Sequence, residues 1–290
     1  MSPRARVVAI VSAAALVAVG GTVGGTVLQT RGQSSGTAAR KGFPPLELPA
    51  SRALTLYQAG KHDRAGALFA RSHTLAGKIG AAFSRWPKGT LDEVKKLVAA
   101  NPRSSLAELH LGLAYYWSGR DADAASAWKR AAAVEPDTPY AVTALDFLHP
   151  NVAPGLPPIV VDARTITPRA RGLLLKGIVL WDRELPLSAK RYLDAAAVRA
   201  PHDPVVLVAD AMSTFSPAHP LRPFPKLGPL TAAFPQAAVV RLHLGVLLLW
   251  TRQVEKGRRQ LRLAIAAEPD SVYASQAKAL LKALAEGGTR

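Results

Sequence analysis

The sequence has no cysteine among its 290 residues, and aromatic residues make up only 6%. Without cysteine there can be no disulfides, thiolate metal sites, cysteine nucleophiles or lipidated N-terminal cysteine. The scarcity of aromatics accompanies an abundance of alanine and leucine. Side chains that are not branched at Cβ lose little rotamer freedom in a helix, so the composition favours helix over strand.

Acidic residues are also scarce, with 20 Asp and Glu against 37 Lys and Arg and a net charge of +17. The sequence has no dense run of basic residues with interleaved aromatics, so we expect no nucleic-acid partner. Two interpretations of the charge remain. It can be a solvated arginine-rich surface, or it can attach the protein to anionic lipid or cell-wall polymer.

An uncharged stretch follows two arginines close to the N-terminus. As a helix, residues 7–27 would span about 30 Å, the thickness of a bilayer core. We therefore predict that residues 1–30 are a transmembrane helix with the rest of the chain outside the cytoplasm, or a cleaved signal segment that leaves it secreted. Residues 31–45 are rich in Gly, Ser and basic residues and are expected to form a flexible linker.

An internal repeat is the most informative feature of the sequence. Leu109-His110-Leu111-Gly112 recurs as Leu242-His243-Leu244-Gly245, and Glu135-Pro136-Asp137 recurs as Glu268-Pro269-Asp270 at the same offset. A match over this length without gaps indicates two copies of one helix–turn–helix unit.

The repeat resembles the tetratricopeptide repeat family, and the chain as a whole resembles a membrane-anchored member of bacterial type. The best copy, at 105–138, matches the family pattern at Leu111, Gly112, Tyr115, Gly119, Ala124, Trp128, Ala131 and Pro136. Further copies lie at 238–271 and 170–203, with a degraded one at 46–75. At equivalent places Gly112, Gly177 and Gly245 lack a side chain, so a second helix can approach closely.

The resemblance implies an all-α fold, an irregular α-solenoid of stacked helix pairs that follows the N-terminal hydrophobic helix. We expect one lobe at 46–148 and another at 168–290, with a proline-rich connector at 149–167 between them. The expected helices are 50–59, 62–84, 91–100, 105–118, 121–134, 139–148, 168–182, 186–199, 204–215, 226–233, 237–251, 254–267 and 271–285.

In this family the first helix of each repeat lines a concave surface, so the resemblance also implies where a partner would bind. The residues at these positions are Leu109, Leu113, Tyr116, Trp117, Leu174, Ile178, Trp181, Leu242, Val246, Leu249 and Trp250. They are unusually apolar. They predict either a groove for a partner helix or extended apolar segment, or first helices that other helices cover on all sides.

The sequence contains no zincin, nucleophile-elbow, phosphate-loop or EF-hand motif. The histidines do not fall at metal-ligand spacing; His110 and His243 are repeat-equivalent and are interpreted as packing or surface positions. Asp203 is interpreted as a helix cap. We therefore expect no metal, cofactor or catalysis, although an enzyme of unrecognised type would show ionisable residues converging in a pocket. The favoured hypothesis is an extracytoplasmic scaffold or adaptor that binds a protein or peptide partner.

Overall fold

The computed structural model describes residues 39–162, 164 and 166–287, and these residues fall into two compact units. The first unit ends at Leu148 and the second begins at His149. The predicted N-terminal anchor or signal segment lies outside the described residues. Within the described part, the secondary structure consists of fourteen α-helices and contains no strand, which agrees with the predicted all-α fold.

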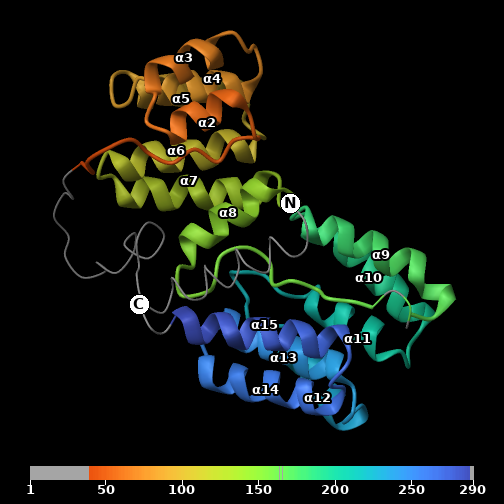
Figure 1. Ribbon diagram of the computed structural model, residues 1–290. Coiled ribbons are helices and arrows are strands. Elements are labelled where there is room, and N and C mark those ends of the chain that lie inside the picture. Colours follow the sequence, from red (N-terminus) through yellow and green to blue (C-terminus); the bar gives the residue numbers. More distant parts are fainter. Residues whose placement is uncertain (1–38, 163, 165, 288–290) are drawn as a thin grey trace. The chain divides into compact units, whose positions relative to one another are not determined.

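The first unit stacks seven of these helices, each against the next in chain order. The helix α6 also packs against α4 and α8, so it lies at the centre of the unit (Figure 1). The helices of this unit are α2 (Arg52–Gln58), α3 (His62–Ala70), α4 (Leu75–Phe83), α5 (Thr90–Ala100), α6 (Ser105–Trp117), α7 (Asp121–Val134) and α8 (Pro139–Leu148).

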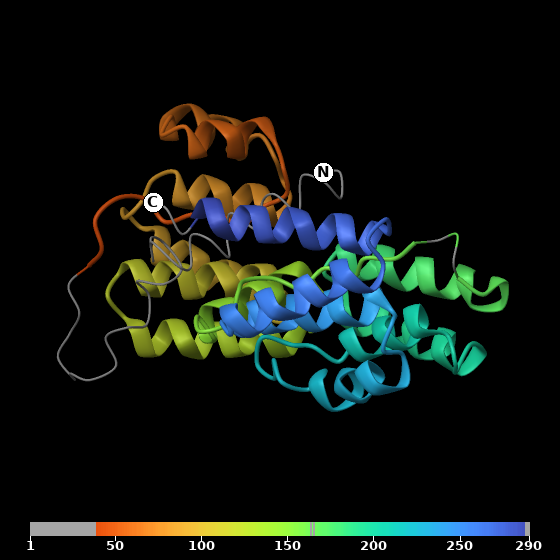
Figure 2. The same cartoon turned by 60° about the horizontal axis from the view of Figure 1, so that its bottom comes forward.

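The second unit has the same plan, and its central helix is α13, which packs against α11, α12, α14 and α15. Figure 2 shows α13, α14 and α15 in blue as neighbouring helices in a second view. The helices are α9 (Pro168–Asp182), α10 (Pro186–Arg199), α11 (Pro204–Met212), α12 (Phe224–Ala233), α13 (Ala238–Trp250), α14 (Val254–Ala267) and α15 (Val272–Gly287).

One expected helix, 62–84, is two helices, α3 and α4. Thr74 caps α4 by accepting a hydrogen bond from the Gly77 N–H at 3.1 Å. The chain then folds back so closely that a methyl group at Gly80 would lie 2.5 Å from the ring of Phe69. A capping threonine and a glycine that admits an aromatic ring therefore turn one apolar run into an antiparallel pair.

The three repeat-equivalent glycines face neighbouring helices, as predicted. A methyl group at Gly112 would lie 2.2 Å from the indole nitrogen of Trp128, and one at Gly177 would lie 2.6 Å from Leu193. At Gly245 it would lie 2.9 Å from Leu261. In each case the glycine lets a large apolar side chain of the second helix lie directly on the backbone of the first.

The repeated Glu-Pro-Asp motif also has a structural reason. Glu135, at the end of α7, accepts hydrogen bonds from the Ser105 backbone N–H at 2.7 Å and from the Ser105 hydroxyl at 3.2 Å. Glu268 likewise accepts from the Ala238 N–H at 3.3 Å. Each glutamate therefore satisfies an unpaired N–H at the start of the central helix and places negative charge at its positive end.

Replacing Glu135 with alanine is expected to lower the free energy of unfolding by about 1 kcal/mol, because it removes a helix cap. Urea denaturation of the two proteins measures the difference. Glu135→Gln keeps an acceptor oxygen and should retain at least half of the lost stability. Equal losses in both variants would contradict the capping role.

Candidate functional site

Two buried histidines occupy the middle of the central helices. His110 and His243 are both 0% exposed. In each ring Nδ1 lies close to the carbonyl oxygen one turn earlier, at 2.8 Å from Leu106 O and 2.7 Å from Val239 O. Nδ1 therefore carries the proton and Nε2 is an acceptor, because a neutral imidazole has one of each. Burial lowers the pKa of both side chains to about 4 and keeps them neutral.

The acceptor nitrogen of each histidine receives a backbone N–H from an extended segment of the same unit. In the first unit the donor is Glu47, at 3.3 Å from His110 Nε2. In the second unit it is Val160, at 2.9 Å from His243 Nε2. We call residues 39–49 the strap and residues 153–161 the second segment. In Figure 1 the strap is the red-orange coil that crosses α6.

A second backbone contact fixes the beginning of each extended segment. The Arg40 N–H donates to the Trp117 carbonyl at 2.9 Å, and the Ala153 N–H donates to the Trp250 carbonyl at 3.0 Å. Trp117 and Trp250 end the two central helices, where carbonyl groups lack helical partners. Each segment therefore joins the C-terminal end of its central helix to a histidine in the middle of that helix.

Two tryptophan side chains donate hydrogen bonds to carbonyl groups of the second segment. The indole N–H of Trp181 donates to the Pro157 carbonyl at 2.8 Å, and that of Trp250 donates to the Gly155 carbonyl at 3.4 Å. Near the end of the segment the Asp162 N–H donates to the Tyr273 hydroxyl at 3.1 Å. These hydrogen bonds are made with main-chain groups, so they require an extended backbone rather than a particular side chain.

The structure places ten of the eleven predicted binding residues in the interior and leaves Trp117 half-buried. Neighbouring helices and an extended segment cover most of α6 and of α13. Tyr116, Trp117, Trp181 and Trp250 contact these segments directly. The other seven predicted residues are buried: Leu109, Leu113, Leu174, Ile178, Leu242, Val246 and Leu249. Their contact with another protein remains a prediction.

Sequence reasoning missed the two segments although a signal was present. Gly42-Phe43-Pro44-Pro45-Leu46-Glu47-Leu48 and Gly155-Leu156-Pro157-Pro158-Ile159-Val160-Val161 share one pattern, Gly-apolar-Pro-Pro-apolar-x-apolar. Glu47 and Val160, the two donors to histidine, stand at the same place in it. The predicted flexible linker at 31–45 thus includes residues that contact the first unit from Arg40 on, and the connector at 149–167 includes the second segment.

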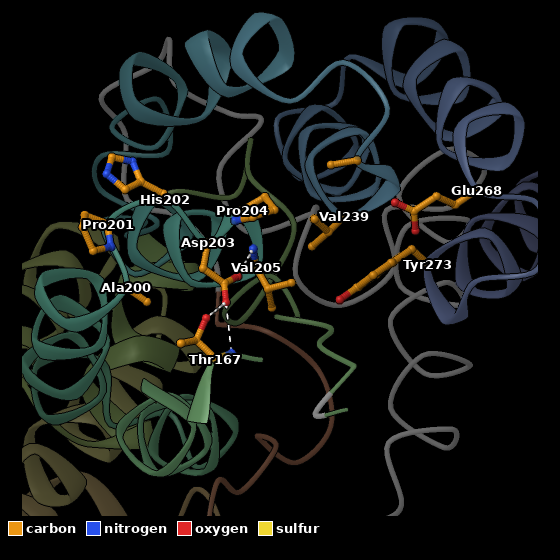
Figure 3. A pocket seen from close by; sticks show the side chains of 11 residues that line it. Thr167, Ala200, Pro201, His202, Asp203, Pro204, Val205, Val239, Glu268 and Tyr273 are labelled. Atoms are coloured by element: carbon orange, nitrogen blue, oxygen red, sulfur yellow. Dashed lines mark hydrogen bonds between the residues drawn. The ribbon is translucent and has the colours of Figure 1, made fainter. Parts of the chain in front are cut away.

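A cavity of about 500 Å³ in the second unit lies between the N-terminal ends of α11 and α13 (Figure 3). Its carboxylates serve as helix caps. Asp203 accepts from the N–H of Val205 and from the N–H and hydroxyl of Thr167 (Figure 3). It also accepts from the N–H of Val206, so it caps α11 as predicted. Glu268 accepts from Ala238. The cavity therefore lies at a junction of capped helix ends.

Within residues 39–162, 164 and 166–287, no three His, Asp or Glu side chains are placed to hold a metal ion. Among the helices of the same residues, none combines the length and the apolar character needed to cross a bilayer. The predicted membrane segment at 7–27 is not among them.

No protein-family model matches the chain, and no curated protein does. Two solved structures are similar in part. YrrB, a TPR protein with an unusual peptide-binding site, is 16% identical, with 79% of this chain and 99% of that chain covered and a TM-score of 0.31. The TPR2AB domain of yeast Sti1, in its pHSP90 complex, is 12% identical, with 82% and 96% covered and a TM-score of 0.35. The helix-pair packing described above rests on the contacts of this chain itself.

Proposed function

We propose that the protein is a scaffold that binds extended segments of other proteins outside the cytoplasm, without catalysis of its own. One observation carries the proposal. In both units an extended, proline-containing stretch lies against the central helix through backbone hydrogen bonds to His110 or His243. These faces therefore have the chemistry that holds an extended polypeptide, with apolar walls for alternate side chains and polar groups for its main chain.

The location is proposed from the sequence. Two arginines followed by an uncharged run long enough to span a bilayer would leave the helical units on the far side of the membrane. A scaffold held in this way would bring its partner to the membrane surface. Fusing a reporter that is active only outside the cytoplasm to the C-terminus tests this part. An inactive fusion that accumulates to normal levels would contradict it.

Partner binding is tested with a photoreactive phenylalanine analogue at Trp117, a half-buried residue whose carbonyl accepts a hydrogen bond from the strap. Irradiation of cells carrying the full chain is expected to give a discrete cross-linked product. The same analogue at Val198, which is 82% exposed on α10, is the control and should give none. The absence of a product at Trp117, or the same products at both positions, would overturn the scaffold proposal.

Ionic strength separates this function from attachment to anionic lipid or polymer. A complex held by apolar burial and main-chain hydrogen bonds should survive high salt, because screening acts on charges. The cross-linked product at Trp117 should therefore persist when cells are lysed at about 1 M salt before irradiation. Its loss at high salt would favour charge-driven attachment.

A further inference from the structure

The strap is a ligand that the first unit supplies to itself. Besides its two backbone contacts with α6, its Pro44 carbonyl accepts a hydrogen bond from the Tyr57 hydroxyl at 2.7 Å. Phe43 stacks on the ring of His62 with centroids 3.6 Å apart. Pro44 and Leu46 are buried, although the strap has no helical or strand structure of its own. Its conformation is therefore fixed by the surface beneath it, which we call the groove and which includes Tyr57, His110, Trp117 and Asp121.

The chain contains this ligand twice, and the two copies show which features the surface reads. Gly, the two prolines and the apolar residue after them recur at the same places. Gly42 and Gly155 both have a positive φ, of 90° and 75°, a backbone conformation that favours glycine. Leu46 and Ile159, which follow the prolines, are 5% and 6% exposed. The surfaces on α6 and α13 therefore both bind the pattern Gly-apolar-Pro-Pro-apolar in an extended conformation.

A charged contact distinguishes the strap from the second segment. The Arg40 guanidinium donates to both carboxylate oxygens of Asp121, at 3.0 and 3.3 Å, and also to the Tyr116 carbonyl. It lies over the Tyr116 ring, 3.2 Å from its centroid. In the second unit Ala153 stands at the place of Arg40. The first unit therefore adds an arginine site, with a planar carboxylate partner and an aromatic face.

The two segments also differ in how they are attached. Helices α8 and α9 hold the second segment at both ends, whereas among described residues the strap is joined to a helix only at α2. The strap is held by main-chain hydrogen bonds to Trp117, His110 and Tyr57 and by the stacking of Phe43 on His62. It also has the Arg40–Asp121 ion pair, whose side chains are 22% and 33% exposed. Release of the strap would break these contacts but none of those that pack helices α2 to α8 against one another.

We propose that the first-unit groove is a binding site for an extended segment of another protein with the pattern Arg-x-Gly-apolar-Pro-Pro-apolar, and that the strap keeps it closed. The arginine of the ligand takes the Asp121 site, and a main-chain N–H takes His110. This inference rests on the proposed function, because it names the ligand of that scaffold. The apparent association constant for the ligand is then the intrinsic constant multiplied by the fraction of time that the strap leaves the groove free.

The experiment uses the full chain in detergent and a fluorescent peptide with the sequence of residues 39–50. Arg40→Ala combined with Leu46→Ser weakens the strap and leaves the groove unchanged. Fluorescence anisotropy is expected to show saturable binding to this variant, roughly tenfold or more tighter than to the wild type. Equal affinity for both proteins, or no binding to either, would overturn the proposal.

Charge exchange tests the arginine site. A peptide with Glu in place of its Arg should bind the weakened-strap variant roughly tenfold more weakly than the original peptide. Adding Asp121→Arg to the protein should reverse the order of the two peptides. If the order does not change, Asp121 does not read the ligand and the proposed pattern is wrong.

A cut strap avoids any dependence on how the variants fold. A protease site placed in the exposed stretch 49–51 lets the strap be cleaved after folding. The labelled peptide should then replace the strap while the helix content stays constant. Unfolding on cleavage would show that the strap is part of the core, and pairing of the released strap with a second copy would show that the ligand is this chain itself; either result overturns the proposal.

The two tests fail separately. Peptide binding without a cross-linked partner at Trp117 would support this site and contradict the scaffold function. A cross-linked partner without peptide binding would leave the scaffold standing and contradict this ligand.

Discussion

A single methyl group at Gly112 is expected to destabilise the first unit by about 3 kcal/mol. The added carbon would lie 2.2 Å from Nε1 and 2.3 Å from Cδ1 of Trp128, which is 2% exposed and cannot swing into solvent. Forcing this ring aside costs about 3 kcal/mol of packing, and about 1 kcal/mol more from its hydrogen bond to the Leu109 carbonyl. The better helix propensity of alanine returns about 1 kcal/mol.

The same substitution elsewhere provides matched controls. A methyl group at Gly172, inside α9, meets no atom within 4 Å, so Gly172→Ala should stabilise the protein by about 0.5–1 kcal/mol. Gly245→Ala should fall between the two, because it meets the tip of the Leu261 side chain at 2.9 Å rather than a fixed ring.

Hydrogen exchange of the α6 and α13 amides measures these effects unit by unit, since the two units need not unfold together. Similar losses at Gly112 and Gly172 would mean that close packing at the repeat positions does not control stability.

Helix pairing could be predicted from the sequence because it depends on local and periodic features. The glycines at 112, 177 and 245 repeat with their large partners at fixed distances along the chain, and each pair meets across one turn. The expected bounds of α7, α8, α9, α10 and α14 agree with the structure at both ends. These elements carry their own start and stop signals, such as the prolines at the beginning of α9 and α10.

The grooves could not be predicted in the same way, because their occupants have no periodicity. The strap and the second segment are short, rich in proline and glycine, and typical of loops when considered alone. What fixes them is distant in the chain, such as His110 for Glu47 and His243 for Val160. The repeat shows that the two histidines are equivalent. Their role as acceptors for the extended segments depends on contacts between distant parts of the chain, which only the structure shows.

Acid is expected to weaken both units through these histidines. The pKa of His243 is about 4 in the folded protein, against an ordinary value of 6.5, because burial disfavours the imidazolium. Between these values the unfolded chain binds a proton that the folded chain does not. The free energy of unfolding therefore falls as the pH drops from 6.5 to about 4, by roughly 3 kcal/mol for each histidine.

Replacing His243 with glutamine isolates this contribution. Val160, which donates to His243, has no ionisable side chain, whereas Glu47 over His110 has a carboxyl group, so His243 is the cleaner probe. Glutamine keeps an acceptor for the Val160 N–H but does not titrate. Below pH 6.5, the slope of the unfolding free energy with pH should therefore decrease by about 1.4 kcal/mol per pH unit in this variant.

Urea denaturation at several pH values, with His202→Gln at an exposed position as the control, measures this slope. Protonation of His243 would give Nε2 a hydrogen directed at the Val160 N–H, so two donors would face each other at 2.9 Å. The second segment should consequently lose its hydrogen-exchange protection before α13 and α14 do. An unchanged slope in His243→Gln, or simultaneous loss of protection in the segment and the helices, would show that the histidine does not hold the segment in its groove.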